Sequence, residues 1–285
     1  MNSAKKQAKY WKAVDENVVL CKLCPHHCRI AEAKSGICRV RENIGGTLYA
    51  ASYGLISSLA LDPIEKKPLR HFHPGSQILS IGGFGCNFRC PFCQNFRISL
   101  EYDKEEGEHF TPEAVLGFAL QTIPKGNIGV AYTYNEPLIG YEFVYDCAKL
   151  IHEAGLKNVV VTNGFVSEDT LMDLLPLIDA MNIDLKSFSP KFYQKIGGEL
   201  EAVKQTIKIA NDNCHVEVTT LVIPGENEDD IIKIAKWLAT INADIPLHLT
   251  RFQPQYKYDD RIATNVMTIT RLAEEASRYL KNVLI

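Results

Sequence analysis

The chain lacks a long apolar run, a large excess of charge of either sign, internal repeats and low-complexity tracts. No apolar stretch approaches the ~20 residues that a helix needs to cross a bilayer, so no membrane association is predicted. The net charge of -3 gives no sign of a nucleic-acid-binding surface. The first ten residues are charged and contain no apolar segment. This excludes a typical secretory signal and predicts a cytoplasmic protein.

Cysteine, by contrast, is abundant, with nine residues in the chain. Because the cytosol keeps thiols reduced, this number favours metal ligation over disulfides. Seven of the nine fall into two groups, whereas Cys147 and Cys214 stand alone and are expected to be ordinary buried residues.

The most informative segment is Cys86-x3-Cys90-x2-Cys93, which closely follows an apolar run. Three thiolates at this spacing can hold three irons of a [4Fe-4S] cube, and no fourth cysteine occurs at matching spacing. One iron would then stay open, and an open metal position is where chemistry usually takes place. A zinc site or a local disulfide is the alternative, although zinc sites normally combine two Cys-x2-Cys pairs.

The composition separates a region rich in Cys, His and Lys, predicted over 1–75, from a regular alternation over 76–285. In the second region, apolar runs alternate with segments of helical periodicity, which predicts an α/β fold with a parallel sheet of βαβ units. Six units are fewer than the eight of a complete TIM barrel. The strands are expected at 77–82, 128–133, 158–162, 181–185, 215–222 and 247–252, and the helices at 112–122, 141–153, 167–175, 200–211, 229–239 and 266–280.

The N-terminal cysteines form the pattern Cys21-x2-Cys24-x3-Cys28-x9-Cys38. Four thiols in eighteen residues suit a tetrahedral zinc ion or an auxiliary [4Fe-4S] cluster, and the spacing does not decide between them. A histidine from the pair between Cys24 and Cys28 could replace one thiol. Reduced thiols without a ligand are the remaining alternative.

The Cys86-x3-Cys90-x2-Cys93 motif resembles the signature of the radical S-adenosylmethionine (SAM) family. In that family, the amino and carboxylate groups of SAM chelate the open iron. An electron from the cluster then breaks a C–S bond and gives a 5'-deoxyadenosyl radical, so the cofactor supplies the difficult chemistry. The family is known for a partial (β/α)6 TIM-like barrel, which agrees with the pattern of six units.

In a parallel barrel, the C-terminal ends of the strands converge on one mouth, where active sites lie. The resemblance implies that polar residues at these ends bind SAM. Asn135 and Glu136 match the Gly-Gly-Glu element that receives the SAM amino group, although Tyr134-Asn135 replaces the two glycines. Thr162 and Asn163 match the Thr-Asn-Gly of glycyl-radical-enzyme activating proteins. The alternatives are a helix cap for Glu136 and an ordinary Asn-Gly turn.

The string Asp184-Leu-Lys186 is identical to an element that binds SAM in the activating enzymes, where it would hold the ribose or the methionine carboxylate. An acid and a base two residues apart on a strand face the same side, so an exposed ion pair is the alternative. Phe92 matches the family's usual apolar or aromatic residue near the adenine, with packing over the cluster as the alternative. The apolar Val222, at the end of an expected strand, is expected to pack on the adenine face. Gln253, where relatives carry a His, is expected to contact SAM or substrate.

Two further strings, Cys-x-Leu-Cys-Pro-His-His-Cys from Cys21 and Asp-Pro-Ile-Glu-Lys-Lys-Pro-Leu from Asp62, resemble the AmmeMemoRadiSam-system radical SAM proteins. These proteins are related to pyruvate formate-lyase activating enzymes. The resemblance implies association with Memo-like and AMMECR1-like proteins, and a ferredoxin or flavodoxin as low-potential electron donor. It implies an enzyme that abstracts a hydrogen atom from a glycine Cα of a partner protein or from a small molecule.

Two other functions stay open at this point. An iron–sulfur electron-transfer or metal-scaffold protein without SAM turnover would use the same cysteines, but it has no need of Asp184-Leu-Lys186 or of an open iron. A SAM-dependent methyl or carboxypropyl transferase with the same cluster differs only in how SAM is oriented, and nothing in the chain excludes it.

Overall fold

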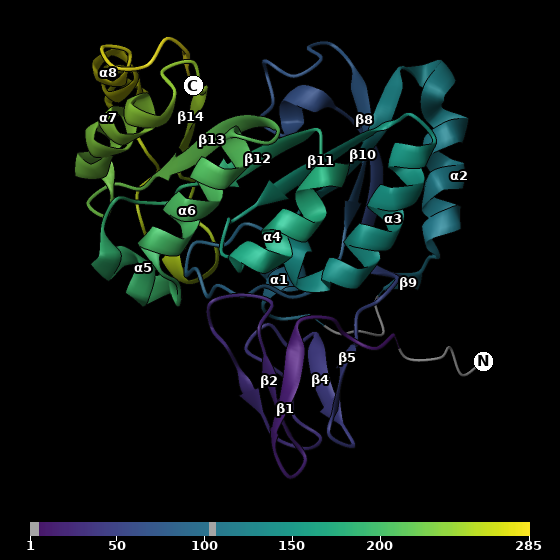
Figure 1. Cartoon of the computed structure of the whole chain (residues 1–285). Coiled ribbons are helices and arrows are strands. Elements are labelled where there is room, and N and C mark those ends of the chain that lie inside the picture. Colours follow the sequence, from purple (N-terminus) through teal and green to yellow (C-terminus); the bar gives the residue numbers. More distant parts are fainter. Residues whose placement is uncertain (1–5, 103–106) are drawn as a thin grey trace.

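The computed structural model describes residues 6–102 and 107–285 (Figure 1). Its main element is an eight-stranded sheet with the order β15-β14-β13-β12-β11-β10-β8-β7. Neighbouring strands from β8 to β15 are parallel, and β7 pairs antiparallel with β8. The strands are β7 Ser58–Pro63, β8 Gln77–Gly82, β10 Asn127–Thr133, β11 Lys157–Thr162, β12 Ala180–Asp184, β13 His215–Val222, β14 Leu247–Arg251 and β15 Val283–Leu284.

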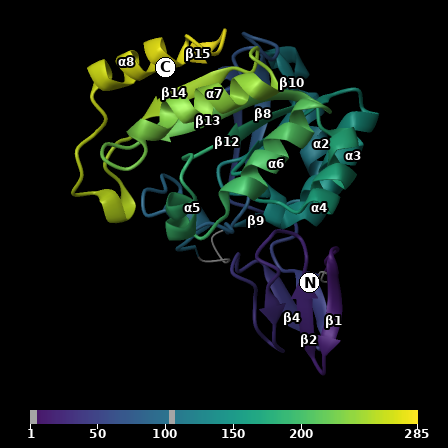
Figure 2. The ribbon, with the colours of Figure 1, turned by 60° about the vertical axis from the view of Figure 1, so that its left-hand side comes forward.

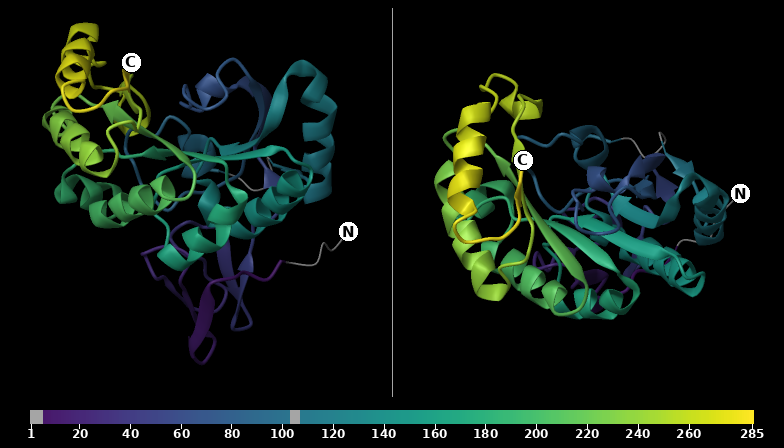
Figure 3. Two further views of the ribbon diagram at one scale, coloured as in Figure 1. Left: turned by 45° about the horizontal axis from the view of Figure 1, so that its top comes forward. Right: turned by 90° about the horizontal axis from the view of Figure 1, so that it is seen from above.

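Helices cover the outer side of the curved sheet, as the view from above shows (Figure 3). Strand residues such as Val130, Val160 and Ile183 are fully buried, because the helices cover one face of the sheet and the barrel interior lies on the other. The predicted partial (β/α)6 barrel is therefore confirmed. The helices are α1 Phe96–Ser99, α2 Pro112–Thr122, α3 Tyr141–Glu153, α4 Glu168–Leu174, α5 Pro190–Ile196, α6 Leu200–Asn211, α7 Ile231–Ile241 and α8 Val266–Ala276. Short 3-10 helices are η1 Ile64–Lys66, η3 Ile123–Lys125, η4 Pro137–Gly140, η5 Leu175–Leu177, η6 Glu228–Asp230 and η7 Tyr256–Tyr258.

The N-terminal region forms small antiparallel sheets that project from the side of the barrel where α1 and α4 lie (Figures 1 and 2). β7 belongs to the barrel sheet although it precedes residue 75. The boundary between the two regions at residues 75 and 76 stays a prediction. The small strands of this region are β1 Trp11–Asp15, β2 Val18–Cys21, β3 Arg29–Ile30, β4 Arg41–Ile44, β5 Thr47–Ala50 and β6 Leu55–Ile56. β6 pairs with β9 Glu108–His109, which follows later in the chain.

A buried ion pair joins this region to the barrel. Arg41 Nη1 lies 3.0 Å from both carboxylate oxygens of Glu142 on α3, and both side chains are 1% exposed. The same carboxylate accepts a hydrogen bond from the backbone N–H of Lys9 at 2.7 Å. Such a pair holds its partners in one arrangement, because breaking it would leave an uncompensated buried charge.

The N-terminal ends of the strands are closed by the segment 64–76. The fully buried carboxylate of Glu217 on β13 accepts hydrogen bonds from the backbone N–H groups of Arg70 and His71 at 3.1 and 2.8 Å. It also lies 3.0 Å from His215 Nε2 and 2.5 Å from His248 Nε2. Glu217 therefore fixes the closing segment to the inside of the barrel. Within the described part of the chain, no helix has the length and apolar character needed to span a membrane.

Candidate active site

The cysteines of the Cys86 motif lie in the loop between β8 and α1, at the C-terminal ends of the parallel strands. Cys90 is buried, and Cys86 and Cys93 are partly buried. The backbone N–H of Phe88 donates to Cys86 Sγ at 3.3 Å, and the N–H of Cys93 donates to the carbonyl of Cys90 at 3.3 Å. The loop thus folds back on itself and gathers the three thiols.

Burial raises the pKa of the Cys90 thiol to about 12; Lys186 opposes this shift, and Cys93 and Asp184 add to it. The pKa of Cys86 is raised well above its ordinary value by burial, Glu136 and the other two cysteines. Free thiolates would be unfavourable here, whereas metal binding releases the thiol protons and supplies positive charge. The donor set, three soft sulfur ligands, fits an iron–sulfur cluster.

The Glu136 carboxylate connects the ends of β10 and β11. Its Oε1 accepts hydrogen bonds from Thr162 Oγ1 at 2.7 Å and from the Leu138 N–H at 3.0 Å, and its Oε2 accepts from the Asn163 N–H at 2.7 Å. Glu136 is 3% exposed, and this burial raises its pKa to about 7 despite the three hydrogen bonds. The predicted residues Glu136, Thr162 and Asn163 are therefore brought together, and the capping alternative for Glu136 also holds at η4.

Asn163 extends this network to the cluster loop. Its Nδ2 donates to Asn87 Oδ1 at 2.8 Å and lies 3.7 Å from Cys86 Sγ. Asn135 makes a second link, since its Oδ1 accepts from the Gly83 N–H and its Nδ2 donates to the Gly85 carbonyl, both at 3.0 Å. The ends of β10 and β11 thus hold the loop that carries the cysteines.

Tyr134 has φ = +70°, in the left-handed region that favours glycine. This backbone requirement explains why glycine suits the corresponding position of the Gly-Gly-Glu element. Here the tyrosine is held by its side chain, because its hydroxyl donates to Asp62 Oδ2 at 2.7 Å and Lys67 Nζ lies 4.5 Å from its ring centre. A Cβ at Gly82 would lie 2.8 Å from the Tyr134 ring, so this glycine leaves the ring its space.

Asp184 and Lys186, at the end of β12, form an ion pair of 2.7 Å with side chains 33% and 17% exposed. Burial would lower the pKa of Lys186, but Asp184 and Cys90 more than offset burial, so the pKa is raised and the ammonium stays charged. A charged pair beside Cys90 that keeps some exposure can also contact a ligand.

The remaining predicted residues are less clearly joined to this network. The Phe92 ring is buried against Phe192 and Tyr258, with ring centres 5.9 and 6.0 Å away. Val222 is fully buried, and Gln253 is exposed just after β14. Their predicted contacts with SAM stay predictions.

The four N-terminal cysteines line one cavity of about 10 Å³, which is room for about one water. Burial raises the pKa of Cys24 to about 12 and that of Cys38 to about 11. Across residues 6–102 and 107–285, no three His, Cys, Asp or Glu side chains are arranged around one point as ligands of a single ion. The ligands of a cubane cluster bind different irons and need not converge in this way.

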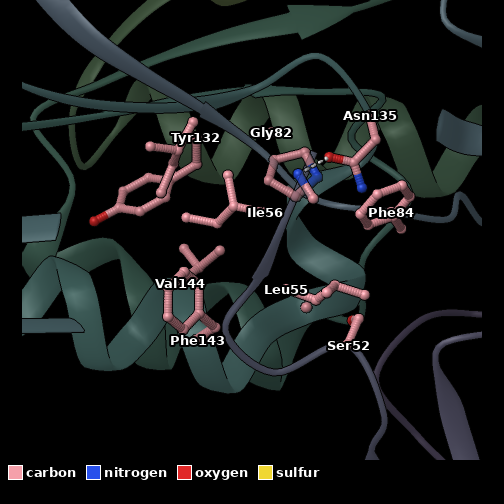
Figure 4. A pocket seen from close by; sticks show the side chains of 13 residues that line it. Ser52, Leu55, Ile56, Gly82, Phe84, Tyr132, Asn135, Phe143 and Val144 are labelled. Carbon is pink, nitrogen blue, oxygen red and sulfur yellow. Dashed lines mark hydrogen bonds between the residues drawn. The ribbon is translucent and has the colours of Figure 1, made fainter. Parts of the chain in front are cut away.

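A separate, mainly apolar pocket lies beside the Asn135–Gly83 hydrogen bond (Figure 4). Ile56, Tyr132 and Phe143 contribute to its walls. Its carbon-rich lining offers no set of metal ligands.

Gly198, between α5 and α6, leaves space for the cluster loop. A Cβ there would lie 2.3 Å from the ring of the buried Phe88. We expect Gly198→Ala to destabilise the protein by about 1–3 kcal/mol through overpacking, and to lower the iron content because Phe88 follows Cys86. Thermal unfolding and iron analysis measure both effects. The control is Gly117→Ala in α2, where nothing lies within 4 Å of the added Cβ; equal behaviour of the two variants would contradict the expectation.

A sequence profile of the radical SAM superfamily matches residues 80–238. The chain belongs to the radical SAM superfamily. Family membership implies a [4Fe-4S] cluster and SAM as its cofactors. This radical SAM enzyme is 42% identical over 271 residues to the uncharacterized protein MJ0808 of Methanocaldococcus jannaschii, a match that covers 93% of this chain and 79% of that protein.

Two named relatives are more distant. The pyruvate formate-lyase 1-activating enzyme of Escherichia coli is 29% identical over 156 residues, or 51% of this chain and 61% of that enzyme. The crystal structure of QueE from Escherichia coli shares the fold with a TM-score of 0.52 at 16% identity, covering 81% of this chain and 92% of QueE. The radical SAM enzyme is thus related to activating enzymes of glycyl-radical proteins.

Sequence reasoning missed two residues of this area. Asn87 joins Asn163 to the cluster loop, and Arg41 lines the N-terminal cysteine cavity. The position of Asn87 directly after Cys86 was the one available signal. Arg41 offered none, because its partner Glu142 is 101 residues away in the sequence.

Proposed function

We propose that Cys86, Cys90 and Cys93 bind a [4Fe-4S] cluster and that the residues at the strand ends hold SAM on its open iron. With both groups bound, one electron from the reduced cluster would break a C–S bond of SAM and give methionine and a 5'-deoxyadenosyl radical, which could abstract a hydrogen atom from the substrate. The supporting observation is the hydrogen-bonded network from Glu136 through Asn163 to Cys86 Sγ.

The chain's own residues have distinct tasks in this proposal. Asn135 and Glu136 position the SAM amino group. Thr162 and Asn163 hold this side of the SAM site in a fixed position relative to the loop that carries the cysteines. Lys186 keeps its proton and offers a fixed positive charge to the methionine carboxylate. Phe92 and Val222 are assigned to the adenine side of SAM, and Gln253 to SAM or the substrate.

We propose that the substrate is a glycyl residue of a partner protein. The likeness to the pyruvate formate-lyase 1-activating enzyme supports this class of substrate. The AmmeMemoRadiSam-like strings support Memo-like and AMMECR1-like proteins as associates, with a ferredoxin or flavodoxin as donor in the cytoplasm. Residues 1–75 would form a metal-binding region beside the barrel of 76–285.

The ion pair at the end of β12 gives a direct test of SAM binding. We expect Lys186→Met to weaken SAM binding about 10–100-fold, since a charge-assisted contact contributes about 1.5–3 kcal/mol. The SAM-induced change in the electron paramagnetic resonance spectrum of the reduced cluster measures the affinity.

The matched control is Lys157→Met, which removes a lysine paired at 2.6 Å with Asp179 at the opposite ends of the strands. We expect the affinity of this variant to equal that of the wild type. An undiminished affinity of Lys186→Met, with its cluster intact, would remove Lys186 from the SAM site.

A further inference from the structure

The loop between β14 and α8 forms a compact strap, residues 253–263, whose two ends are held together. The Phe252 N–H donates to Thr264 Oγ1 at 3.0 Å, and the Thr264 N–H donates to the Phe252 carbonyl at 3.0 Å. Thr264 Oγ1 also donates to the carbonyl of Val222 at 2.6 Å, which fixes these ends to β13. Compact surface loops with joined ends are frequently functional.

The tip of the strap is hydrogen-bonded to the loop that carries the cysteines. The Lys257 N–H donates to the Pro91 carbonyl at 3.0 Å. Gln255 Nε2 donates to the Gln94 carbonyl, also at 3.0 Å. Since Pro91 and Gln94 lie on either side of Cys93 in the sequence, these two hydrogen bonds fix the backbone around this cysteine.

An aromatic stack makes a second contact between the strap and this part of the chain. The rings of Tyr256 and Phe96 have centres 4.6 Å apart and planes at 17°, and the Tyr256 hydroxyl donates to Glu101 Oε1 at 3.0 Å. Tyr256 has φ = +56°, in the left-handed region that favours glycine. Such backbone persists only where its surroundings hold it, and it clusters at functional sites. Here the stack and the hydrogen bond hold it.

Glu226, in the turn after β13, anchors the strap to the barrel. Its Oε1 accepts hydrogen bonds from the Tyr258 hydroxyl at 3.0 Å and from Arg261 Nη1 at 2.6 Å. Both of its carboxylate oxygens accept from Lys195 Nζ of α5 at 2.9 Å. The Arg261 guanidinium also lies 3.4 Å from the centre of the Tyr258 ring. Two residues of the strap thus share one carboxylate, which gives the strap a fixed position relative to the barrel.

Phe92, which the proposed function assigns to the adenine side of SAM, lies between the strap and α5. Its buried ring has its centre 6.0 Å from that of Tyr258 in the strap and 5.9 Å from that of Phe192 on α5. The strap thus contacts Phe92 at its ring and, through Pro91, at the adjacent backbone. A shift of the strap would displace Phe92 and the neighbouring Cys93 together.

We propose that Tyr256 is a positioning residue: its stack on Phe96 holds the strap against the cysteine loop and so places Phe92 and Cys93 for SAM. This role rests on the proposed function of the cluster. Tyr256 acts only through the residues that the strap holds, so its loss should weaken SAM binding and leave the chemical step unchanged once SAM is bound.

The Tyr256→Ala variant removes both the stack and the hydrogen bond to Glu101. We expect its affinity for SAM, read from the SAM-induced change in the electron paramagnetic resonance spectrum of the reduced cluster, to fall about 10-fold. The KM for SAM in 5'-deoxyadenosine formation should rise accordingly, while kcat changes less than about threefold. A merely structural role would lower the active fraction, and with it kcat, without moving KM.

Two further variants separate the stack from general effects. Tyr256→Phe keeps the stack and loses only the hydroxyl, so its affinity should lie within about threefold of the wild type. Tyr279→Ala is the matched control, because Tyr279 is an exposed tyrosine after α8 whose ring lies near Lys236. We expect this variant to bind SAM like the wild type.

Hydrogen–deuterium exchange gives a readout that needs neither SAM nor turnover. The amides of residues 91–101 should exchange faster in Tyr256→Ala than in the wild type and in Tyr279→Ala. Unchanged SAM affinity, or unchanged exchange of residues 91–101, in Tyr256→Ala would overturn the role of Tyr256 and leave the proposed function standing.

A loss of affinity in Tyr256→Phe as large as in Tyr256→Ala would also overturn this role, because the stack would then not be the contact that holds the strap. Absence of any SAM-induced change in the wild type, with its cluster intact, would instead refute the proposed function. The exchange comparison tests the hold of the strap on the cysteine loop in either case.

Discussion

Replacing Cys90 by alanine will reduce 5'-deoxyadenosine formation to background, a loss of about three orders of magnitude or more. The first site offers three thiols, and no fourth cysteine occurs at matching spacing to replace one. Cys90 is buried beside the charged side chains of Lys186 and Asp184. Without Cys90 the cluster would be lost, and this ion pair would no longer lie next to it. Product analysis after incubation with SAM and dithionite measures the rate.

Cys147→Ala is the matched control for this substitution. Cys147 is also a buried cysteine, but it lies on α3 in the hydrophobic core. We expect this variant to lose some stability and to keep its iron and its rate per cluster. Substantial SAM cleavage by Cys90→Ala would show that the three-cysteine motif does not carry the reaction.

Replacing Glu217 by alanine will lower the free energy of unfolding by about 3–5 kcal/mol, the usual cost of breaking a buried charged network. The carboxylate is fully buried. It accepts hydrogen bonds from two backbone N–H groups and is hydrogen-bonded to the Nε2 atoms of His215 and His248. Its loss would leave the buried His248 without its acceptor and would release the Arg70 and His71 N–H groups of segment 64–76. Urea unfolding followed by circular dichroism measures the change.

The same network makes the stability depend on pH. Burial would raise the pKa of Glu217, but hydrogen bonds from His215, His248 and the His71 N–H lower it to about 2. Since the pKa is lower in the folded state than the ordinary value of 4.5, the carboxylate stabilises the fold above pH ~4.5. This contribution is lost as the pH falls from ~4.5 towards ~2.

Glu217→Gln should therefore flatten the stability profile over that pH range. The control is Glu201→Ala, which removes an exposed carboxylate paired with Lys204 and should change the stability by less than ~0.5 kcal/mol. A loss for Glu217→Ala no greater than for Glu201→Ala would contradict the role of Glu217.

The strands of the barrel were predictable because their apolar runs are continuous. Residues 77–82 and 215–222 form β8 and β13 with the predicted bounds, since both faces of these strands are covered. The antiparallel β7 was missed because its last residues, Asp62 and Pro63, begin a polar stretch that resembles a linker. The two-residue β15 depends on pairing with β14, which no local pattern indicates.

The site could be predicted where its residues follow strands. Glu136, Thr162 and Asn163 converge because parallel strands end at one edge. The contacts of Asn87 with His26 and of Arg41 with Glu142 could not be predicted, because they depend on how the N-terminal region packs against the barrel. Such long-range packing leaves no periodic pattern in the sequence.

The most direct test of the central claim is SAM cleavage by the anaerobically reconstituted protein with dithionite. We predict 5'-deoxyadenosine and methionine in equal amounts, formed by protein that carries at least about four irons. Full iron loading without any cleavage of SAM would contradict the account and would favour an iron–sulfur protein that only transfers electrons.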